Sequence, residues 1–86
     1  MLNLLLLGTS GCHLCEEAEA IIASCQLDKH KVSIEMLDIV EQDQYQAEFS
    51  LFIPVIYHPD SLKRLNWPFD AEQVHEFVGQ YNTRTY

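Results

Sequence analysis

The feature that most constrains the fold is a short apolar run, Leu4 to Leu7, which Gly8 ends. The run is too short for an ordinary helix, and its lack of polar alternation is typical of a strand buried on both faces. Strands of that kind lie in the centre of parallel sheets whose two faces are covered by helices. The run therefore predicts a small α/β domain.

The rest of the chain alternates between helical and strand patterns. Apolar residues at helical spacing predict helices from Cys12 to just before Asp28, over 41–50 and from Asp70 onward, and β-rich stretches predict strands over 32–39, 52–57 and 62–65. The element order is then β-α-β-α-β-β-α, in which the first two strands are parallel with a right-handed crossover. The last two strands should form an antiparallel hairpin. We expect one domain over residues 1–86, with a central mixed sheet flanked by helices.

Charge and hydropathy argue against two kinds of partner. The 86 residues carry a formal net charge of −8, whereas binding to nucleic acid or to an anionic membrane requires a basic surface. The first apolar stretch has no basic residue before it and is far shorter than the ~20 residues of a membrane span. Thr9 also stands where a lipidated Cys12 would need an aliphatic residue. We therefore expect a protein of the reducing cytoplasm, where structural disulfides are rare.

Two of the three cysteines, Cys12 and Cys15, stand three positions apart between the first predicted strand and the first predicted helix. Three residues of a helix turn through about 300°, so the two sulfurs lie on nearly the same face, one turn apart. Cys12 is at the helix N-terminus, where unpaired N–H groups and the helix dipole favour a thiolate. A Cys-x-x-Cys pair beside a β-α-β pattern indicates a redox site, with Cys12 as the nucleophile and Cys15 as the resolving thiol.

The charges around this pair oppose one another. A protonated His13 would stabilise the Cys12 thiolate, whereas the carboxylates of Glu16, Glu17 and Glu19 would disfavour it. We expect a modest lowering of the pKa of the Cys12 thiol. The alternative for His13 is an exposed polar residue that has no effect on the thiolate.

The remaining residues of metal-binding type are scattered. Cys25 lies ten positions past Cys15, about 15 Å along a helix, and is predicted to be a small buried apolar residue. One Cys-x-x-Cys pair supplies two of the four ligands of a structural zinc site, and no histidine is placed to complete it. We therefore predict no metal site within one chain. Two chains that share their cysteine pairs around zinc or an iron–sulfur cluster are an alternative.

The chain resembles the glutaredoxin branch of the thioredoxin fold, and within it the small glutaredoxin-like bacterial proteins. The resemblance is carried by "CHLC" after the first strand, by "DI" at Asp38–Ile39 and by "FIPVI" at 52–56. It implies a thioredoxin-like (glutaredoxin-like) α/β fold over nearly the whole chain. It also implies a cis Ile53–Pro54 bond that lies against the cysteine pair, where the Ile53 backbone can pair with an extended substrate chain.

The resemblance further implies which residues bind the substrate. These are His13, Leu14, Ile53, Pro54 and Asp70. The family uses an aspartate at the position of Asp70 to cap the last helix and to receive the amine of glutathione. The family's glycine pair before that aspartate is replaced here by Trp67-Pro68-Phe69, and Thr9-Ser10-Gly11 supplies no basic residue before Cys12. Glutathione is therefore a co-substrate that the family suggests and these replacements disfavour.

Together, the motif and the resemblance predict a thiol–disulfide oxidoreductase that needs no organic cofactor. Its expected partners are a disulfide-containing protein or small thiol substrate and a reductant, such as glutathione or a thioredoxin-reductase-type system. The chain is expected to act as a monomer. The alternative is a non-enzymatic thioredoxin-fold binding module, or the dimeric metal or iron–sulfur carrier that uses the same cysteines.

Overall fold

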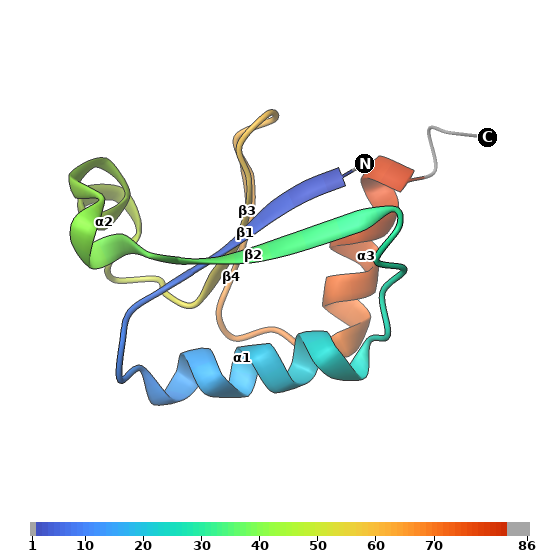
Figure 1. Cartoon of the computed structure of the whole chain (residues 1–86), viewed down its shortest axis with the longest axis horizontal. Helices are drawn as coiled ribbons and strands as arrows, with labels where there is room; N and C mark the ends of the chain where they lie inside the picture. Colours follow the sequence, from blue (N-terminus) through green and yellow to red (C-terminus); the bar gives the residue numbers. More distant parts are fainter. Residues whose placement is uncertain (1, 83–86) are drawn as a thin grey trace.

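The computed structural model describes residues 2–82, which form a mixed sheet flanked by helices (Figure 1). The strands are β1 (Leu2–Gly8), β2 (Val32–Asp38), β3 (Val55–His58) and β4 (Lys63–Asn66). The helices are α1 (His13–Ser24), the 3-10 helix η1 (Ile39–Glu41), α2 (Asp43–Phe49) and α3 (Ala71–Asn82). The predicted order of strands and α-helices is confirmed. The predicted domain bounds, residues 1 and 86, lie outside the described residues.

The sheet has the strand order β2-β1-β3-β4. β1 pairs in parallel with β2, and β3 is antiparallel to both β1 and β4. β1 is therefore a central strand with a neighbour on each side. This explains its unbroken apolar run, because Leu4 and Leu6 pack into the core on one face of the sheet and Leu7 packs into the core on the other.

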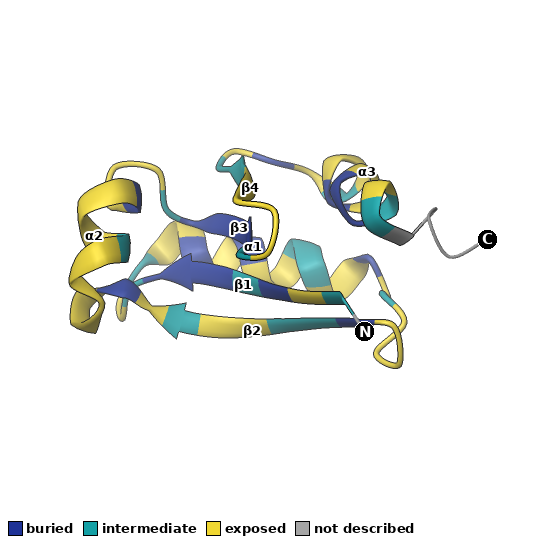
Figure 2. Ribbon diagram, turned by 90° about the horizontal axis from the view of Figure 1, so that it is seen from above, coloured by how far each residue is buried: buried dark blue, intermediate teal, exposed yellow. Residues whose placement is uncertain are grey.

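Two clusters of buried side chains hold the helices to the sheet. The larger one joins β1 and β3 to α1 and α3. The smaller one joins the same strands to η1 and α2 and consists of Leu7, Ile39, Phe49, Val55 and Tyr57. Figure 2 shows the buried stretches of β1 and β3 in the middle of the sheet, while α2 is exposed over most of its surface. Each fully buried aliphatic or aromatic side chain contributes about 1.5–3 kcal/mol.

The third strand begins later than the sequence predicts, at Val55 instead of Phe52. The Phe52 N–H donates to the Phe49 carbonyl over 2.8 Å in a turn that follows α2. Pro54 has no N–H to give to a ladder. The residues before Val55 therefore form a loop, although their composition is typical of a strand.

The ends of α1 and β2 are set by local hydrogen bonds and backbone angles. Cys12 is the N-cap of α1, and the chain leaves this helix at Gln26, whose φ of 52° lies in the left-handed region. At the end of β2, the Asp38 carboxylate accepts the Val40 N–H over 2.9 Å and begins η1. This turn ends β2 at Asp38, one residue before the end of the predicted strand.

Candidate active site

One edge of the sheet gathers the ends of three strands. Gly8 pairs with Asp38 at the ends of β1 and β2, and Leu7 pairs with Val55 at the start of β3. The segments that follow β1 and β2 and the segment that precedes β3 therefore meet at this edge. Figure 1 shows the N-terminus of α1 and α2 at the same end of the molecule. We call residues 9–17 and 38–54 the cysteine end.

Cys12 and Cys15 are joined by a disulfide, with their Cα atoms 5.2 Å apart. The Cys12 Sγ accepts the backbone N–H of Cys15 over 3.1 Å. A donor at the start of a helix is placed to stabilise negative charge on the atom that it contacts. Cys12 is half-buried, whereas Cys15 is only 2% exposed. Cys12 is thus the more accessible member of the pair.

Two glycines make room for this arrangement. A Cβ atom at Gly8 would lie 2.7 Å from the Cys15 Sγ, well inside ordinary contact distance, so the sulfur rests directly on the end of β1. Gly11 has a φ of 76°, a conformation that other residues rarely adopt, and it turns the chain into the helix. The sequence pattern did not predict the contact between Gly8 and Cys15, because it is made between a strand and the helix that follows.

His13 and Leu14 follow Cys12 on the outer surface of α1. The His13 side chain is 84% exposed, with its ring nitrogens 3.7 Å from the carboxylates of Glu16 and Glu17. Leu14 is 42% exposed. Both residues are therefore accessible beside the cysteine pair, and two of the three carboxylates predicted to oppose a thiolate, those of Glu16 and Glu17, are beside His13.

The loop before β3 reaches the same edge of the sheet. Its Ile53–Pro54 peptide bond is cis, Pro54 is buried and Ile53 is half-buried. The Pro54 carbonyl accepts the Trp67 N–H over 3.1 Å, which continues the pairing of β3 with β4. The Trp67–Pro68 bond is also cis, which the sequence did not predict.

The structure does not bring Asp70 to the Cys12–Cys15 pair. Its carboxylate accepts the Gln73 N–H over 2.9 Å, and the Gln73 side chain accepts the Asp70 N–H over 3.0 Å. This reciprocal pair is a capping box, so the predicted N-cap is confirmed. The adjoining Ala71 carbonyl lies 3.7 Å from the Cys25 Sγ. Because Cys25 caps the C-terminal end of α1, Asp70 lies toward the opposite end of that helix from Cys12.

Cys25 is a buried thiol, as predicted, with 6% of its surface exposed. Burial raises the pKa of the Cys25 thiol, because a thiolate would lose its hydration there. The Sγ also lies 3.2 Å from the Ile21 carbonyl. Cys25 therefore belongs to the contact between α1 and α3, away from the disulfide.

Arg64 of β4 packs against residues of the cysteine end, a contact that the sequence did not predict. Its guanidinium lies 4.9 Å from the centre of the Phe49 ring and 5.1 Å from that of the Phe52 ring. Its Nη1 is 3.6 Å from the Glu48 carboxylate. Arg64 pairs with Tyr57 across the sheet, and both side chains lie on the α2 side. The alternation along β4 predicts that side but not the aromatic partners of Arg64, because Phe49 lies in α2 and Phe52 in the loop before β3.

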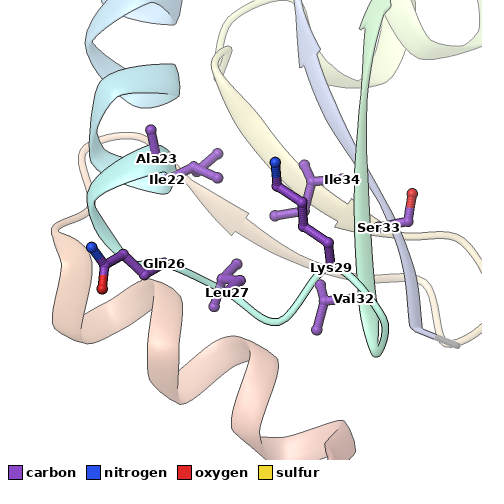
Figure 3. A pocket seen from close by; sticks show the side chains of 8 residues that line it. All are labelled: Ile22, Ala23, Gln26, Leu27, Lys29, Val32, Ser33 and Ile34. Atoms are coloured by element: carbon purple, nitrogen blue, oxygen red, sulfur yellow. The ribbon is translucent and has the colours of Figure 1, made fainter.

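A cavity of about 410 Å³ lies between the C-terminal part of α1 and β2, and Lys29 lines it too. Figure 3 shows the side chains of Ile22 and Leu27 on one side and those of Val32 and Ile34 on the other. None of its lining residues belongs to the cysteine end. The described side chains, residues 2–81, contain no group of three or more histidine, cysteine or acidic residues that could hold a metal ion. Within the same range no helix is long and apolar enough to cross a membrane.

Comparisons with known proteins agree with this architecture. The family model "Glutaredoxin-like domain (DUF836)" matches residues 3–79. The X-ray structure of XcR50, a structural genomics target protein from X. campestris, is 25% identical, with a TM-score of 0.75 over 90% of this chain and 96% of that one. Thioredoxin 1 from the thermophilic eubacterium Thermosipho africanus is 20% identical, with a TM-score of 0.67 over 96% of this chain and 97% of that one. No curated protein matches the sequence. The predicted thioredoxin-like, glutaredoxin-like fold is confirmed.

Proposed function

The chain belongs to the glutaredoxin-like domain family (DUF836), and on that basis we propose that it is a thiol–disulfide oxidoreductase that uses Cys12 and Cys15. The observation that carries the proposal is the unequal placement of the two sulfurs. Cys12 is accessible and accepts an N–H at the start of α1, whereas Cys15 is buried behind it. This asymmetry suits one sulfur to attack an outside disulfide and the other to resolve the product.

The reaction proceeds by two exchanges. The Cys12 thiolate attacks one sulfur of the substrate disulfide, a Cys12–substrate disulfide forms, and the first substrate thiolate leaves and takes up a proton. Cys15, having lost its proton, then attacks the Cys12 sulfur and releases the second substrate thiol. The substrate gains two electrons and two protons, and the protein gives them up as it forms the Cys12–Cys15 disulfide.

The residues near the pair then hold the substrate. The exposed side chains of His13 and Leu14 provide contacts beside Cys12. The backbone of Ile53, next to Pro54, pairs with an extended segment of the substrate. A role for Asp70 is not part of this proposal, since Asp70 caps α3 beside Cys25.

The reaction requires no organic cofactor, but an outside reductant must reduce the Cys12–Cys15 disulfide after each turnover. Glutathione and a thioredoxin-reductase-type system are the two reductants to compare. The proposal places the protein in the reducing cytoplasm as a monomer, with no nucleic acid or membrane partner.

The first test is the reduction potential of the Cys12–Cys15 pair, measured by equilibration in glutathione and dithiothreitol buffers with alkylation and mass spectrometry. A value of about −200 to −270 mV, as for glutaredoxin and thioredoxin, is expected of a reductase. A pair that never oxidises reversibly would contradict the proposal. Bound zinc or iron in the purified protein would instead favour the carrier that uses the same cysteines.

A second test assigns the roles of the two sulfurs. With a disulfide peptide as substrate, Cys15→Ser should accumulate the mixed disulfide at Cys12, and Cys12→Ser should accumulate none. Cys25→Ser serves as the matched control and should behave as the wild type. Trapping of the peptide at Cys15 in the Cys12→Ser protein would reverse the assignment.

A further inference from the structure

Large apolar side chains are exposed at the cysteine end. Leu14 is 42% exposed on the first turn of α1, and Leu51 and Phe52, just before Ile53, are 89% and 42% exposed. Val40 of η1 is 52% exposed. Apolar groups left in water at the end of the molecule that carries a reactive pair indicate contact with an apolar group of a partner.

The same end of the molecule is acidic. Its exposed carboxylates are those of Glu16, Glu17, Asp38, Glu41, Asp43 and Glu48. The one formal cation that packs there among the described residues is Arg64, which lies against the Phe52 ring and beside Glu48. The described lysines are elsewhere, with Lys29 and Lys31 before β2 and Lys63 opposite His58 at the far end of β3. A disulfide that approaches Cys12 therefore meets carboxylates and apolar groups.

Building on the oxidoreductase function proposed above, we propose that the cysteine end selects disulfides in cationic polypeptide segments that carry a large apolar side chain beside the disulfide. The surrounding carboxylates accelerate the approach of a positively charged substrate to Cys12 and slow the approach of a negatively charged one. The exposed leucines and Phe52 receive the apolar side chain. Glutathione disulfide has more carboxylates than amines and no large apolar group, so it is a poor substrate.

The experiment uses the whole reduced protein and two peptide disulfides that both carry a leucine beside the cysteine. They differ only in their other flanking residues, which are lysines in one and glutamates in the other. Rates are measured by acid quenching and mass spectrometry. At low salt the lysine peptide should react about tenfold faster, or more, than the glutamate peptide or glutathione disulfide. The ratio should fall toward one in about 1 M salt, where charges act over only about 3 Å. Equal rates at low salt would refute the inference.

Matched variants locate the effect. Glu17→Gln with Glu41→Gln should lower the lysine-to-glutamate rate ratio, whereas Glu72→Gln with Glu76→Gln on α3 removes the same charge and should leave the ratio unchanged. An equal fall in both proteins would mean that net charge, not the cysteine end, makes the selection. Leu51→Ser should slow the leucine-bearing peptide but not a serine-bearing one. Leu62→Ser, at an exposed site in the turn between β3 and β4, is its control.

An uncharged substrate separates this inference from the function on which it rests. Hydroxyethyl disulfide has no charge and no large side chain, and the two control proteins, Glu72→Gln with Glu76→Gln and Leu62→Ser, should reduce it at the wild-type rate. If the wild-type protein does not reduce it, the proposed oxidoreductase function fails. If it is reduced while the two peptides react alike, the function holds and the proposed selectivity fails.

Discussion

Replacement of Gly8 by alanine tests the contact between β1 and the buried sulfur. The new Cβ would lie 2.7 Å from the Cys15 Sγ and 3.4 Å from the Cys15 Cβ, against about 3.5–4.0 Å for ordinary contacts. Overpacking of this kind destabilises a fold by about 1–3 kcal/mol. Replacement of a glycine within a strand by alanine stabilises it by about 0.5–1 kcal/mol. We expect Gly8→Ala to lower the free energy of unfolding of the disulfide form by about 1–2 kcal/mol.

The reduced form should lose less stability, because a free Cys15 side chain can turn away from the new methyl group. The mutation then disfavours the disulfide relative to the dithiol. A difference of about 1.4 kcal/mol between the two forms raises the reduction potential by about 30 mV. The assays are urea unfolding of the oxidised and reduced proteins and redox equilibration with glutathione.

Gly79 of α3 provides the control, because a Cβ there meets nothing within 4 Å. Gly79→Ala should stabilise the helix by about 0.5–1 kcal/mol and leave the potential unchanged. Wild-type stability and potential in Gly8→Ala would refute the reasoning. An equal loss in the oxidised and reduced forms would show that a contact other than the Cys15 sulfur limits the site.

Three further substitutions probe the rest of the fold. Asp70→Ala should cost about 1 kcal/mol in urea unfolding, because it removes the N-cap of α3, and a comparable loss in Glu72→Ala would contradict the assignment. Arg64→Met keeps the aliphatic stem but removes the cation from the Phe52 ring, so it should lower stability by about 0.5–1 kcal/mol, and an unchanged unfolding midpoint would argue against the stacking. In the oxidised protein, the raised pKa of Cys25 stabilises the fold at pH below the ordinary thiol range, and this contribution is lost as pH rises toward the higher folded pKa. Cys25→Ala should flatten that alkaline decline in stability, and an identical decline in both proteins would assign it to other groups.

Much of the fold follows from patterns over neighbouring residues. The apolar run at Leu4–Leu7 identifies a central strand, and helical spacing after Cys12 identifies α1. The cap at Asp70 is visible because its partner is only three residues away. These predictions succeed because a helix or a cap is made of contacts between residues close in sequence.

The sequence also misled at one point. Phe52 to Pro54 has the composition of a strand, but the turn after α2 takes the Phe52 N–H and Pro54 offers none, so the strand starts at Val55. The resemblance predicts Asp70 as a ligand residue, which stays a prediction. The structure shows Asp70 capping α3, with the adjoining Ala71 carbonyl near the Cys25 Sγ.

The sequence by itself determined the element order, the position of Cys12 at a helix start and the buried character of Cys25, since each depends on local periodicity and helix geometry. Only the tertiary structure decided that Cys15 rests on Gly8, that Arg64 lies against Phe49 and Phe52, and that one end of the sheet is both apolar and acidic. These features join residues from different elements. These contacts depend on strand register and on how the two core clusters pack, and the pattern of residues along the chain specifies neither.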